Sequence, residues 1–568
     1  MAQRMSRRRK TPHISSNEDA TSTCAPTLPA ELHFASKASF LGAIALIALI
    51  VGFTLYGPAL SGPFLFDDFG LPFYLPSFAD NPLGAWLSGV RPVLMLTYWI
   101  NFQMSAREPW TYHALNVVIH AVNSVLVFML LLRILRLQSI ESRRAILCAA
   151  VGCSIFLIHP IQTEAVAYIA GRSELICGFF SLAALVVYTG VGDLTARRAF
   201  AVLALYCLAV LSKEQAVVLA GVFLVIDTVF RRRSLREALN RGVWLYAPIA
   251  IVGVFATLAI VGLLARSSTA GFSVPGIQWY EYLFTQFRVW LLYLGLAILP
   301  FRQNADYDIA ISRSLADQGS AVALAVLCLG ALVIWQQRKR LPILLAGALM
   351  FAILLIPASS VIPLQDVAAE RRMYLPLVGL LLILIQMLAR WSLSSMVTTG
   401  LVAYALTCCA LTYERAKVWG SDIAFWEDAT QASPGKSRGY THLAYAYIRS
   451  HRCTDAIKLT ERAPEEARKT PELLGMQGHA YACESRVKEA VEAFERVVLI
   501  GPGVGRYLAL ASSYRRAGRV SDAEAAEQQA MKLTPRTHYD VTMLETFKGS
   551  IGQSRSRSAP FGTVRSGN

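Results

Sequence analysis

The chain of 568 residues is strongly apolar, with 55% hydrophobic and only 16% charged residues. A soluble protein of this length needs more charge on its surface, so the composition excludes a wholly soluble protein. The net charge of +16 does not indicate a nucleic-acid partner, because the basic residues stand at the ends of apolar blocks, as the positive-inside rule expects. The sequence therefore predicts a membrane protein that is long enough for more than one domain.

The predicted elements begin after a basic, polar tail over residues 1–38, which we expect to be disordered and cytoplasmic. The first apolar block has no small-residue cleavage site at its end, so we interpret it as a retained anchor. Blocks of about twenty residues can cross a bilayer, and shorter ones can if they tilt. The blocks are Leu41–Tyr56, Val117–Leu132, Ala145–Ile158, Leu175–Tyr188, Phe200–Leu211, Val217–Phe230, Ala247–Leu264, Ala321–Trp335, Ile343–Ile356, Leu377–Leu388 and Met396–Leu411.

Positive charge sets the predicted orientation of these spans. If all six basic clusters are cytoplasmic, the blocks form eleven spans over residues 39–413, with the N-terminus inside and the C-terminus outside. Tyr282–Leu299 would break this alternation, and it contains Gln286 and Arg288, so we predict a horizontal or re-entrant helix on the outer surface. A second surface helix is expected over Pro92–Met104. The clusters are Arg4–Lys10, Arg133–Arg144, Arg197/Arg198, Arg231–Arg236, Arg338–Arg340 and Arg390.

The composition turns polar after Tyr413, and a repeat of 33 or 34 residues appears. Its markers are Tyr447, Tyr481 and Tyr514, and likewise Ala456, Ala490 and Ala523. This period predicts about three tetratricopeptide-type helix pairs over residues 414–549, which must stack because one pair cannot bury its apolar face. We expect a disordered tail over residues 550–568. Cys453 and Cys483 could form a disulfide in an oxidising compartment, but the sequence leaves this open.

Many ionisable residues remain on the predicted outer face. Asp67 and Asp68 follow the first span in SGPFLFDDFG. Any one of these charges could be an ordinary loop or interfacial residue. Together, carboxylates and cations at one membrane face suit a substrate with a phosphate and a reaction that needs a base. The others are Arg91, His159, Glu164, Arg172, Glu174, Lys213, Glu214, Glu370, Arg371 and Arg372.

Four segments carry a family resemblance in their order along the chain: the Arg91–Pro92 pair, HPIQTEAVAYIAGR (His159–Arg172), SKEQAVVL (Ser212–Leu219) and ERRMYLP (Glu370–Pro376). With the aspartate pair and the C-terminal repeats, they resemble the transmembrane-and-TPR O-mannosyltransferases. The resemblance implies an all-α fold, in which a GT-C-type transmembrane bundle of about eleven spans precedes a tetratricopeptide solenoid. It also implies an inverting glycosyltransferase that moves a sugar from a polyprenyl-phosphate carrier to a hydroxyl, on protein Ser or Thr, at the extracytoplasmic face.

The resemblance also implies roles for individual residues. Asp67 or Asp68 would be the base, and the sequence does not decide which. Arg372 stands where the family has an uncharged residue, and the chain has fewer repeats than animal relatives. Paired carboxylates can hold a hard cation, so a divalent metal stays an open alternative with no ligands assigned. Donor-phosphate binding falls to Arg91, His159, Arg172, Lys213, Arg371 and Arg372, and an acceptor or supporting role to Glu164, Glu174, Glu214, Glu370 and Tyr374.

Two other classes of protein compete with the transferase. A transporter or flippase of a lipid-linked glycan would place its charges near the membrane midplane, on broken helices. A membrane-anchored repeat scaffold would not need eleven spans. The expected partners are the lipid-linked sugar, a protein or glycan acceptor bound through the repeats, and membrane lipid, but no nucleic acid. The expected location is a bacterial inner membrane with the repeats in the periplasm.

Overall fold

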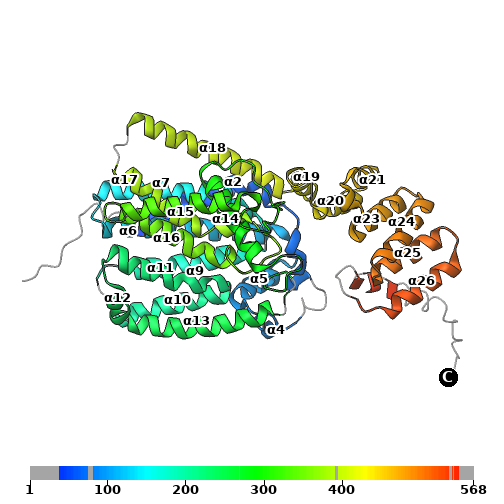
Figure 1. Cartoon of the computed structure of the whole chain (residues 1–568), viewed down its shortest axis with the longest axis horizontal. Coiled ribbons are helices and arrows are strands. Elements are labelled where there is room, and N and C mark those ends of the chain that lie inside the picture. The colour runs from blue at the N-terminus through cyan, green and yellow to red at the C-terminus, as the bar shows by residue number, and fades with distance from the viewer. Residues whose placement is uncertain are drawn as a thin grey trace, which may run out of the picture.

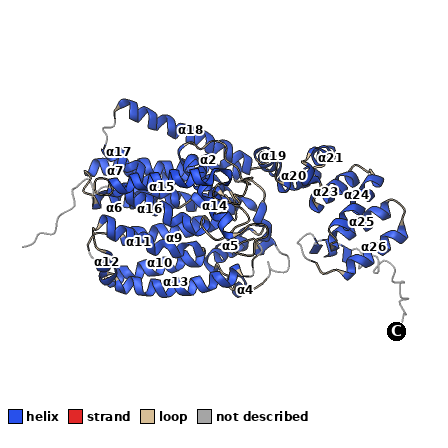
Figure 2. Cartoon of the chain, in the orientation of Figure 1, coloured by secondary structure: helices blue, strands red, loops and turns tan. Residues whose placement is uncertain are grey.

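The computed structural model describes residues 38–74, 81–192, 194–265, 267, 269–390, 394–535, 540–541, 543–545 and 547–548. Within these ranges the regular structure is helical, and the β pairing is an isolated bridge between Ala270 and Leu364 (Figure 2). The all-α prediction is therefore confirmed. Both predicted tails, residues 1–38 and 550–568, lie outside the described residues except for Ala38.

Long apolar helices lie side by side in one bundle (Figure 1). Among the described residues, α2, α6, α13, α15 and α18 are each long and apolar enough to cross a membrane, and α7 with its bent continuation is a sixth candidate. The bundle is therefore a multi-pass membrane domain. Its members are α2 (Ala38–Tyr56), α6 (Pro109–Leu137), α7 (Ser142–Ile158), α9 (Arg172–Tyr188), α10 (Ala196–Ser212), α11 (Leu219–Val225) with η6 (Ile226–Phe230), α13 (Val243–Leu264), α15 (Ser320–Gln337), α16 (Pro342–Leu355), α17 (Pro376–Arg390) and α18 (Ser395–Trp419).

The basic clusters gather at one end of this bundle. Cations are stabilised at helix C-termini, where the last carbonyl groups lack partners within the helix. Hydrogen bonds from arginines to backbone carbonyl oxygens place five of the six predicted clusters at one end of the bundle, as the predicted alternation of spans requires. The sixth cluster, Arg4–Lys10, lies outside the described residues. The donors are Arg133, Arg198 and Arg231, which bond to carbonyl oxygens at the end of α9, Arg144, which bonds to Leu388, and Arg390, which bonds to Arg340.

Two helices lie at the opposite end, between the spans. Helix α14 (Trp279–Ile298) bonds to the loop between α16 and α17, where the Tyr282 hydroxyl donates to Ala358 O at 2.9 Å and Gln286 Nε2 donates to Val367 O at 3.2 Å. Since Arg340, just after α15, lies with Arg390 at the basic end, α14 does not carry the chain across. This agrees with the predicted surface helix. Helix α5 (Pro92–Ser105) matches the second one and begins with proline at its first position.

The repeat region starts with α19 (Asp422–Ala432) and continues with three helix pairs that extend away from the bundle in Figure 1. Helix α18 runs on to Trp419, past the expected domain boundary near Tyr413. Each helix packs on the next, which fits the predicted solenoid. The pairs are α20 (Ser437–Arg449) with α21 (Cys453–Arg462), α23 (Pro471–Cys483) with α24 (Val487–Ile500), and α25 (Val504–Arg516) with α26 (Val520–Lys532); the short α22 (Glu465–Arg468) follows the first.

One contact recurs in every pair and explains the repeat period. A guanidinium group lies over the ring of the repeat tyrosine, at 4.4, 4.6 and 4.3 Å from its centroid. The residue just before each arginine has a positive φ, which turns the chain from the first helix into the second. The disulfide left open by the sequence is present between Cys453 and Cys483 and joins the first pair to the second. The arginine–tyrosine contacts are Arg452 on Tyr447, Arg486 on Tyr481 and Arg519 on Tyr514.

The bundle and the repeat region meet at the loop between α2 and α6, at the end opposite the basic clusters. By the predicted orientation this end is the outer one, and the loop is the first outer loop. A side chain on Gly62 would overlap the carbonyl oxygen of Trp419, and one on Gly420 would overlap that of Pro58. Only glycine permits so close an approach of two backbones. The loop after α2 is therefore packed directly against the junction of α18 and α19.

Candidate functional site

The aspartate pair lies on a short 3-10 helix, η2 (Phe66–Gly70), in the first outer loop. Asp68 is 1% exposed. Its Oδ2 accepts the Leu65 N–H at 2.9 Å, and its Oδ1 accepts the Ala170 N–H at 2.8 Å. Burial raises the pKa of Asp68 to about 8, although both N–H groups and Arg172 oppose this. Asp68 thus closes its own turn and ties it to the loop before α9.

Asp67 has the opposite environment. It is exposed, and the described residues donate no hydrogen bond to its carboxylate. Its backbone N–H donates to the Tyr168 hydroxyl at 2.7 Å, and its charge acts on Arg371. The two carboxylates therefore point in different directions, and only Asp67 offers free oxygen atoms to a substrate.

Arg371 supplies a cation near Asp67. Glu164 accepts the Arg371 backbone N–H at 2.9 Å and also pairs with its guanidinium group. Asp366 lies 3.7 Å from the same guanidinium, and the Tyr168 ring lies 5.8 Å from it. The Arg371 side chain keeps 22% of its surface exposed, whereas Glu164 keeps 3%. The carboxylates thus fix the orientation of a cation that a ligand can still reach.

A second cationic group lies where η5 (Glu214–Val218) begins. Arg91 Nε donates to Glu214 Oε2 at 2.8 Å, and Arg91 Nη2 donates to Oε1 at 2.6 Å. Burial would raise the pKa of Glu214, but the charge and hydrogen bonds of Arg91 outweigh it and hold this pKa at about 2. Lys213 pairs with Glu174, in the first turn of α9. Arg91 retains 34% exposure, so it can contact a ligand at this position.

Three other predicted phosphate ligands are enclosed by the protein. Arg172 is fully buried and donates to Asn116 Oδ1 and Tyr112 O, both at 2.9 Å. Arg372 donates to backbone carbonyl oxygens of the loop before it, including Val367 O at 3.0 Å. His159 is fully buried, with its Nε2 3.1 Å from Ala297 O. In these positions they hold α6, the outer loop and α14 in place and present almost no surface to a lipid phosphate.

The remaining predicted residues brace the outer loops and the bundle. Glu370 Oε1 accepts the Asn304 N–H at 2.8 Å and the Tyr307 hydroxyl at 2.7 Å. Burial raises the pKa of Glu370 to about 7. The Tyr374 hydroxyl is buried inside the bundle, where it accepts a hydrogen bond from Asn123 Nδ2 at 2.9 Å. The acceptor or supporting role of both residues stays a prediction.

The sequence did not single out three polar residues of this site: Tyr168, Asp366 and Arg438. Tyr168 lies inside the quoted HPIQTEAVAYIAGR motif, so its phenol in an apolar outer loop was a usable signal. Asp366 is an outer-loop carboxylate that binds Arg371 and Arg438. Arg438 comes from the repeat region, and no local pattern places it beside a loop more than 300 residues earlier in the chain.

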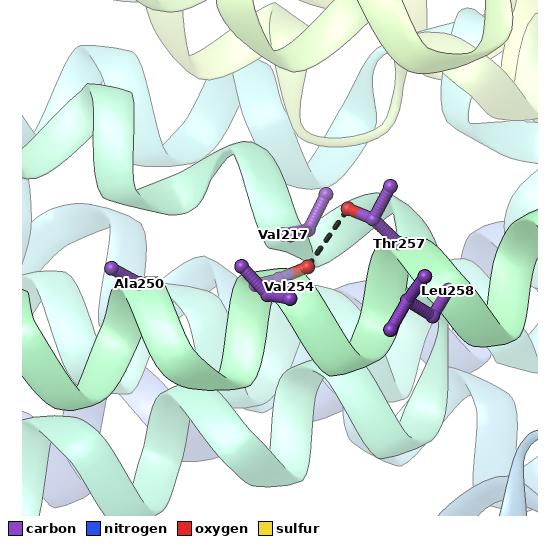
Figure 3. A pocket seen from close by; sticks show the side chains of 6 residues that line it. Val217, Ala250, Val254, Thr257 and Leu258 are labelled. Carbon is purple, nitrogen blue, oxygen red and sulfur yellow. Dashed lines mark hydrogen bonds between the residues drawn. The ribbon is translucent and has the colours of Figure 1, made fainter.

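An apolar groove of about 360 Å³ lies between η5 and α13 (Figure 3). The one hydroxyl that lines it, on Thr257, donates to Gly253 O at 2.8 Å, so it is already satisfied. Since Glu214 and Val217 share the single short helix η5, the groove starts close to the Arg91–Glu214 pair. Its walls are Val217 and, from α13, Ala250, Gly253, Val254, Thr257 and Leu258.

Within the part of the chain that the structure describes, no three His, Cys, Asp or Glu side chains gather as the ligands of one metal ion would. A cation at Asp67 would need further oxygen ligands from substrate or water. The divalent cation that the sequence left open therefore has no cage built from these side chains.

Known proteins show a related chain organisation. The chain is 25% identical to Protein O-mannosyl-transferase F38B6.6 of Caenorhabditis elegans, over 70% of this chain and 59% of that protein. It is 25% identical to mouse Protein O-mannosyl-transferase TMTC3, over 78% and 48%, and 24% identical to human TMTC1, over 69% and 51%. It thus spans about half to three fifths of the length of these relatives. No protein-family model matches it. The chain is related to the transmembrane-and-TPR protein O-mannosyl-transferases, the family that its ordered motifs resemble.

Proposed function

We propose that this protein is an integral-membrane inverting glycosyltransferase. It transfers a sugar, mannose by similarity to its relatives, from a polyprenyl phosphate to a hydroxyl group of a protein. One observation carries the proposal: Asp67 presents a free carboxylate at the outer end of the bundle, and its charge acts on the partly exposed guanidinium of Arg371. The relatives, which are named protein O-mannosyl-transferases, support the same reaction class.

In this reaction Asp67 is the general base. The acceptor oxygen attacks the anomeric carbon on the face opposite the phosphate, and Asp67 takes the hydroxyl proton. The bond from the anomeric carbon to the phosphate oxygen breaks, and the electron pair leaves with the polyprenyl phosphate. Because negative charge grows on that phosphate in the transition state, a cation whose position is already fixed lowers the barrier. Arg371 and Arg91 are the predicted donor-binding cations with the most exposed side chains.

The groove of Figure 3 supports a lipid-linked donor. Its wall is apolar, it lies on a membrane-facing helix, and its wall residue Val217 shares the short helix η5 with Glu214, the partner of Arg91. An isoprenoid chain in the groove would place its phosphate near Arg91, which is far more exposed than Lys213. The apolar wall suits a hydrocarbon because burying it releases about 25 cal/mol for each Å² removed from water.

The proposed orientation follows from the two ends of the bundle. The basic end faces the cytoplasm, so Asp67 and the repeat region lie outside, in the periplasm of a bacterium. Residues 39–413 form the transferase domain, and residues 414–549 form the repeat domain that takes up the protein acceptor.

The decisive experiment compares Asp67→Asn with Glu108→Gln in membranes supplied with a polyprenyl-phosphate sugar and a protein acceptor. Both residues are exposed carboxylates of the loop between α2 and α6, and the charge of Asp67 acts on Arg371. We expect Asp67→Asn to lower the transfer rate by ~10²–10⁴-fold, the usual contribution of a general base, and Glu108→Gln to leave it unchanged. Equal rates in the two variants would remove Asp67 from the mechanism. A wild-type protein that moves the intact lipid-linked sugar across the membrane without transfer would identify a transporter.

A further inference from the structure

Phe66, which directly precedes Asp67, has an unusual backbone conformation. Its φ is 52°, in the left-handed region that residues with side chains seldom adopt. Such a conformation costs ~1–3 kcal/mol and persists only where surrounding contacts impose it. The contacts that hold Phe66 therefore also hold the backbone that carries Asp67.

Most of these contacts come from the repeat region. The Phe66 ring is stacked on Trp426 of α19, with ring centroids 5.1 Å apart and an angle of 24° between the planes. The guanidinium of Arg438, from α20, lies 4.6 Å from the centroid of the same ring. Phe425 meets it edge-on at 5.9 Å, and Tyr168 is its aromatic contact from the bundle, at 6.4 Å.

Arg438 is itself fixed to the membrane domain. Its Nε donates to Asp306 Oδ2 at 2.8 Å, and its Nη2 donates to Asp366 Oδ1 at 2.8 Å. Asp366 also lies 3.7 Å from Arg371, so one carboxylate joins the cation beside Asp67 to the cation over Phe66. The Ser433 hydroxyl, between α19 and α20, donates to Asp306 O at 2.6 Å. The first helices of the repeat region are thus docked through several polar contacts.

We infer that α19 and α20 are part of the catalytic site, with Trp426 and Arg438 as positioning residues that set the direction of the Asp67 carboxylate. The inference rests on the proposed function. A change in the backbone dihedral angles of Phe66 would move the whole of Asp67. A displacement of about 1 Å at a catalytic group can lower the rate about 10²-fold. The repeat region then governs the chemical step in addition to any capture of acceptor.

The two roles of the repeat region predict different kinetics. Loss of Trp426 or Arg438 should lower kcat by ~10–10²-fold and leave the KM of the donor unchanged. It should do so equally with a whole protein acceptor and with a short serine peptide that cannot span the repeats. A region that only captures acceptors would raise the KM of the whole protein and leave the short peptide unaffected.

The test uses the full chain with Trp426→Leu, Trp426→Phe and Arg438→Gln. Trp426→Phe keeps a ring against Phe66 and should restore most of the rate. Arg486→Gln is the matched control, because Arg486 also lies over an aromatic ring, that of Tyr481 at 4.6 Å, and forms an ion pair to Glu489 at 2.9 Å, both far along the chain from Phe66. Thermal unfolding shows which variants are folded at the assay temperature.

A double-mutant cycle separates positioning from general destabilisation. If Trp426 acts through Phe66, the variant Phe66→Leu/Trp426→Leu should be no slower than the slower single variant, because both remove one contact. The inference would be overturned if the rate losses of the two single variants multiplied in the double variant, or if Trp426→Leu and Arg438→Gln kept the wild-type kcat. In both cases Asp67→Asn would still be inactive, so the proposed function would stand. A wild-type protein without any transfer would instead overturn the proposed function.

Discussion

At the scale of single residues, Asp67 and Asp68 are adjacent in sequence but have different burial and different hydrogen-bond partners. They are neighbours of the same type on one short turn. Asp68 directs both oxygens at backbone N–H groups and is buried, while Asp67 keeps its oxygens free. The sequence left open which of the two would be the base; the packing of the loops around them decides which carboxylate stays accessible.

Replacement of the two aspartates by asparagine should separate stability from catalysis. In Asp68→Asn the side-chain amide has one acceptor oxygen and one donor NH₂ group, whereas the Leu65 and Ala170 N–H groups need two acceptors. One of these N–H groups therefore loses its hydrogen bond. Such a buried unpaired group costs ~1–3 kcal/mol. We expect a lower midpoint of thermal unfolding for Asp68→Asn and an unchanged midpoint for Asp67→Asn, measured on protein in detergent. Equal midpoints in the two variants would contradict the hydrogen bonds described for Asp68.

The pH dependence of stability should show the buried carboxyl groups. Burial raises the pKa of Glu370 to about 7 and of Asp68 to about 8, above the values in an unfolded chain. The folded state therefore holds these protons more tightly, so the stabilisation is complete below about pH 4, where both carboxyl groups are also protonated in the unfolded chain. It is lost as the pH rises from there to about 7 for Glu370 and to about 8 for Asp68. Thermal unfolding across this range should show the loss, and Glu370→Gln should flatten part of it. If Glu370→Gln kept the wild-type dependence of thermal stability on pH, Glu370 would not contribute to that dependence.

At the scale of elements, short irregular helices bring the charged residues to one end of the bundle. The breaks between α7 and α9, between α10 and α11, and between α16 and α17 each carry one of the quoted motifs. Irregular backbone in a membrane protein is tolerated where protein or a watery cavity surrounds it. These breaks create both cationic groups and the start of the apolar groove.

Filling the groove should impair long donors selectively. A side chain on Gly253 would begin 3.8 Å from Val217 Cγ2, inside the groove, whereas Gly262 on the same helix has no neighbour within 4 Å. We expect Gly253→Leu to raise the KM of a long polyprenyl-phosphate sugar at least ~10-fold, since each excluded CH₂ forfeits ~0.8 kcal/mol. The KM of a short, water-soluble isoprenyl donor should not change. Gly262→Leu is the control, and an equal effect of the two variants would mean that the groove holds ordinary bilayer lipid.

At the scale of the whole molecule, the two ends of the bundle differ in charge chemistry. One end gathers arginines on helix C-termini, and the other gathers ion-paired carboxylates and cations around Asp67. The repeat region is docked at this second end through Asp306 and Asp366. The proposed reaction site and the repeat region therefore lie at the same end of the bundle.

This polarity makes a topology prediction. A phosphatase reporter that is active only outside the cytoplasm should be active when fused after Lys532 and inactive when fused after Arg241, just before α13. The basic clusters favour the cytoplasmic side for the second position, because positively charged loops are retained there. If the reporter were active after Arg241 and inactive after Lys532, the topology would be the inverse of the predicted one, with Asp67 on the cytoplasmic face.

The sequence by itself determined the all-helical class, the positions of the apolar helices and the repeat period. These depend on local rules: the length of an apolar block, the placement of arginines at its ends, and a contact such as Arg452 on Tyr447 that recurs with the repeat. It also identified the carboxylates and cations of the outer face, since their motifs stand in a fixed order. None of these inferences needs the spatial relation of distant segments.

Only the tertiary structure shows which of these residues are enclosed and which are exposed. Arg172 and Arg371 look alike in sequence, yet one is enclosed by Asn116 and backbone carbonyls and the other remains partly exposed beside Asp67. The docking of Arg438 on Phe66 joins segments more than 300 residues apart. Burial, hydrogen-bond partners and the direction of a side chain are properties of the packed assembly, and no local pattern encodes them.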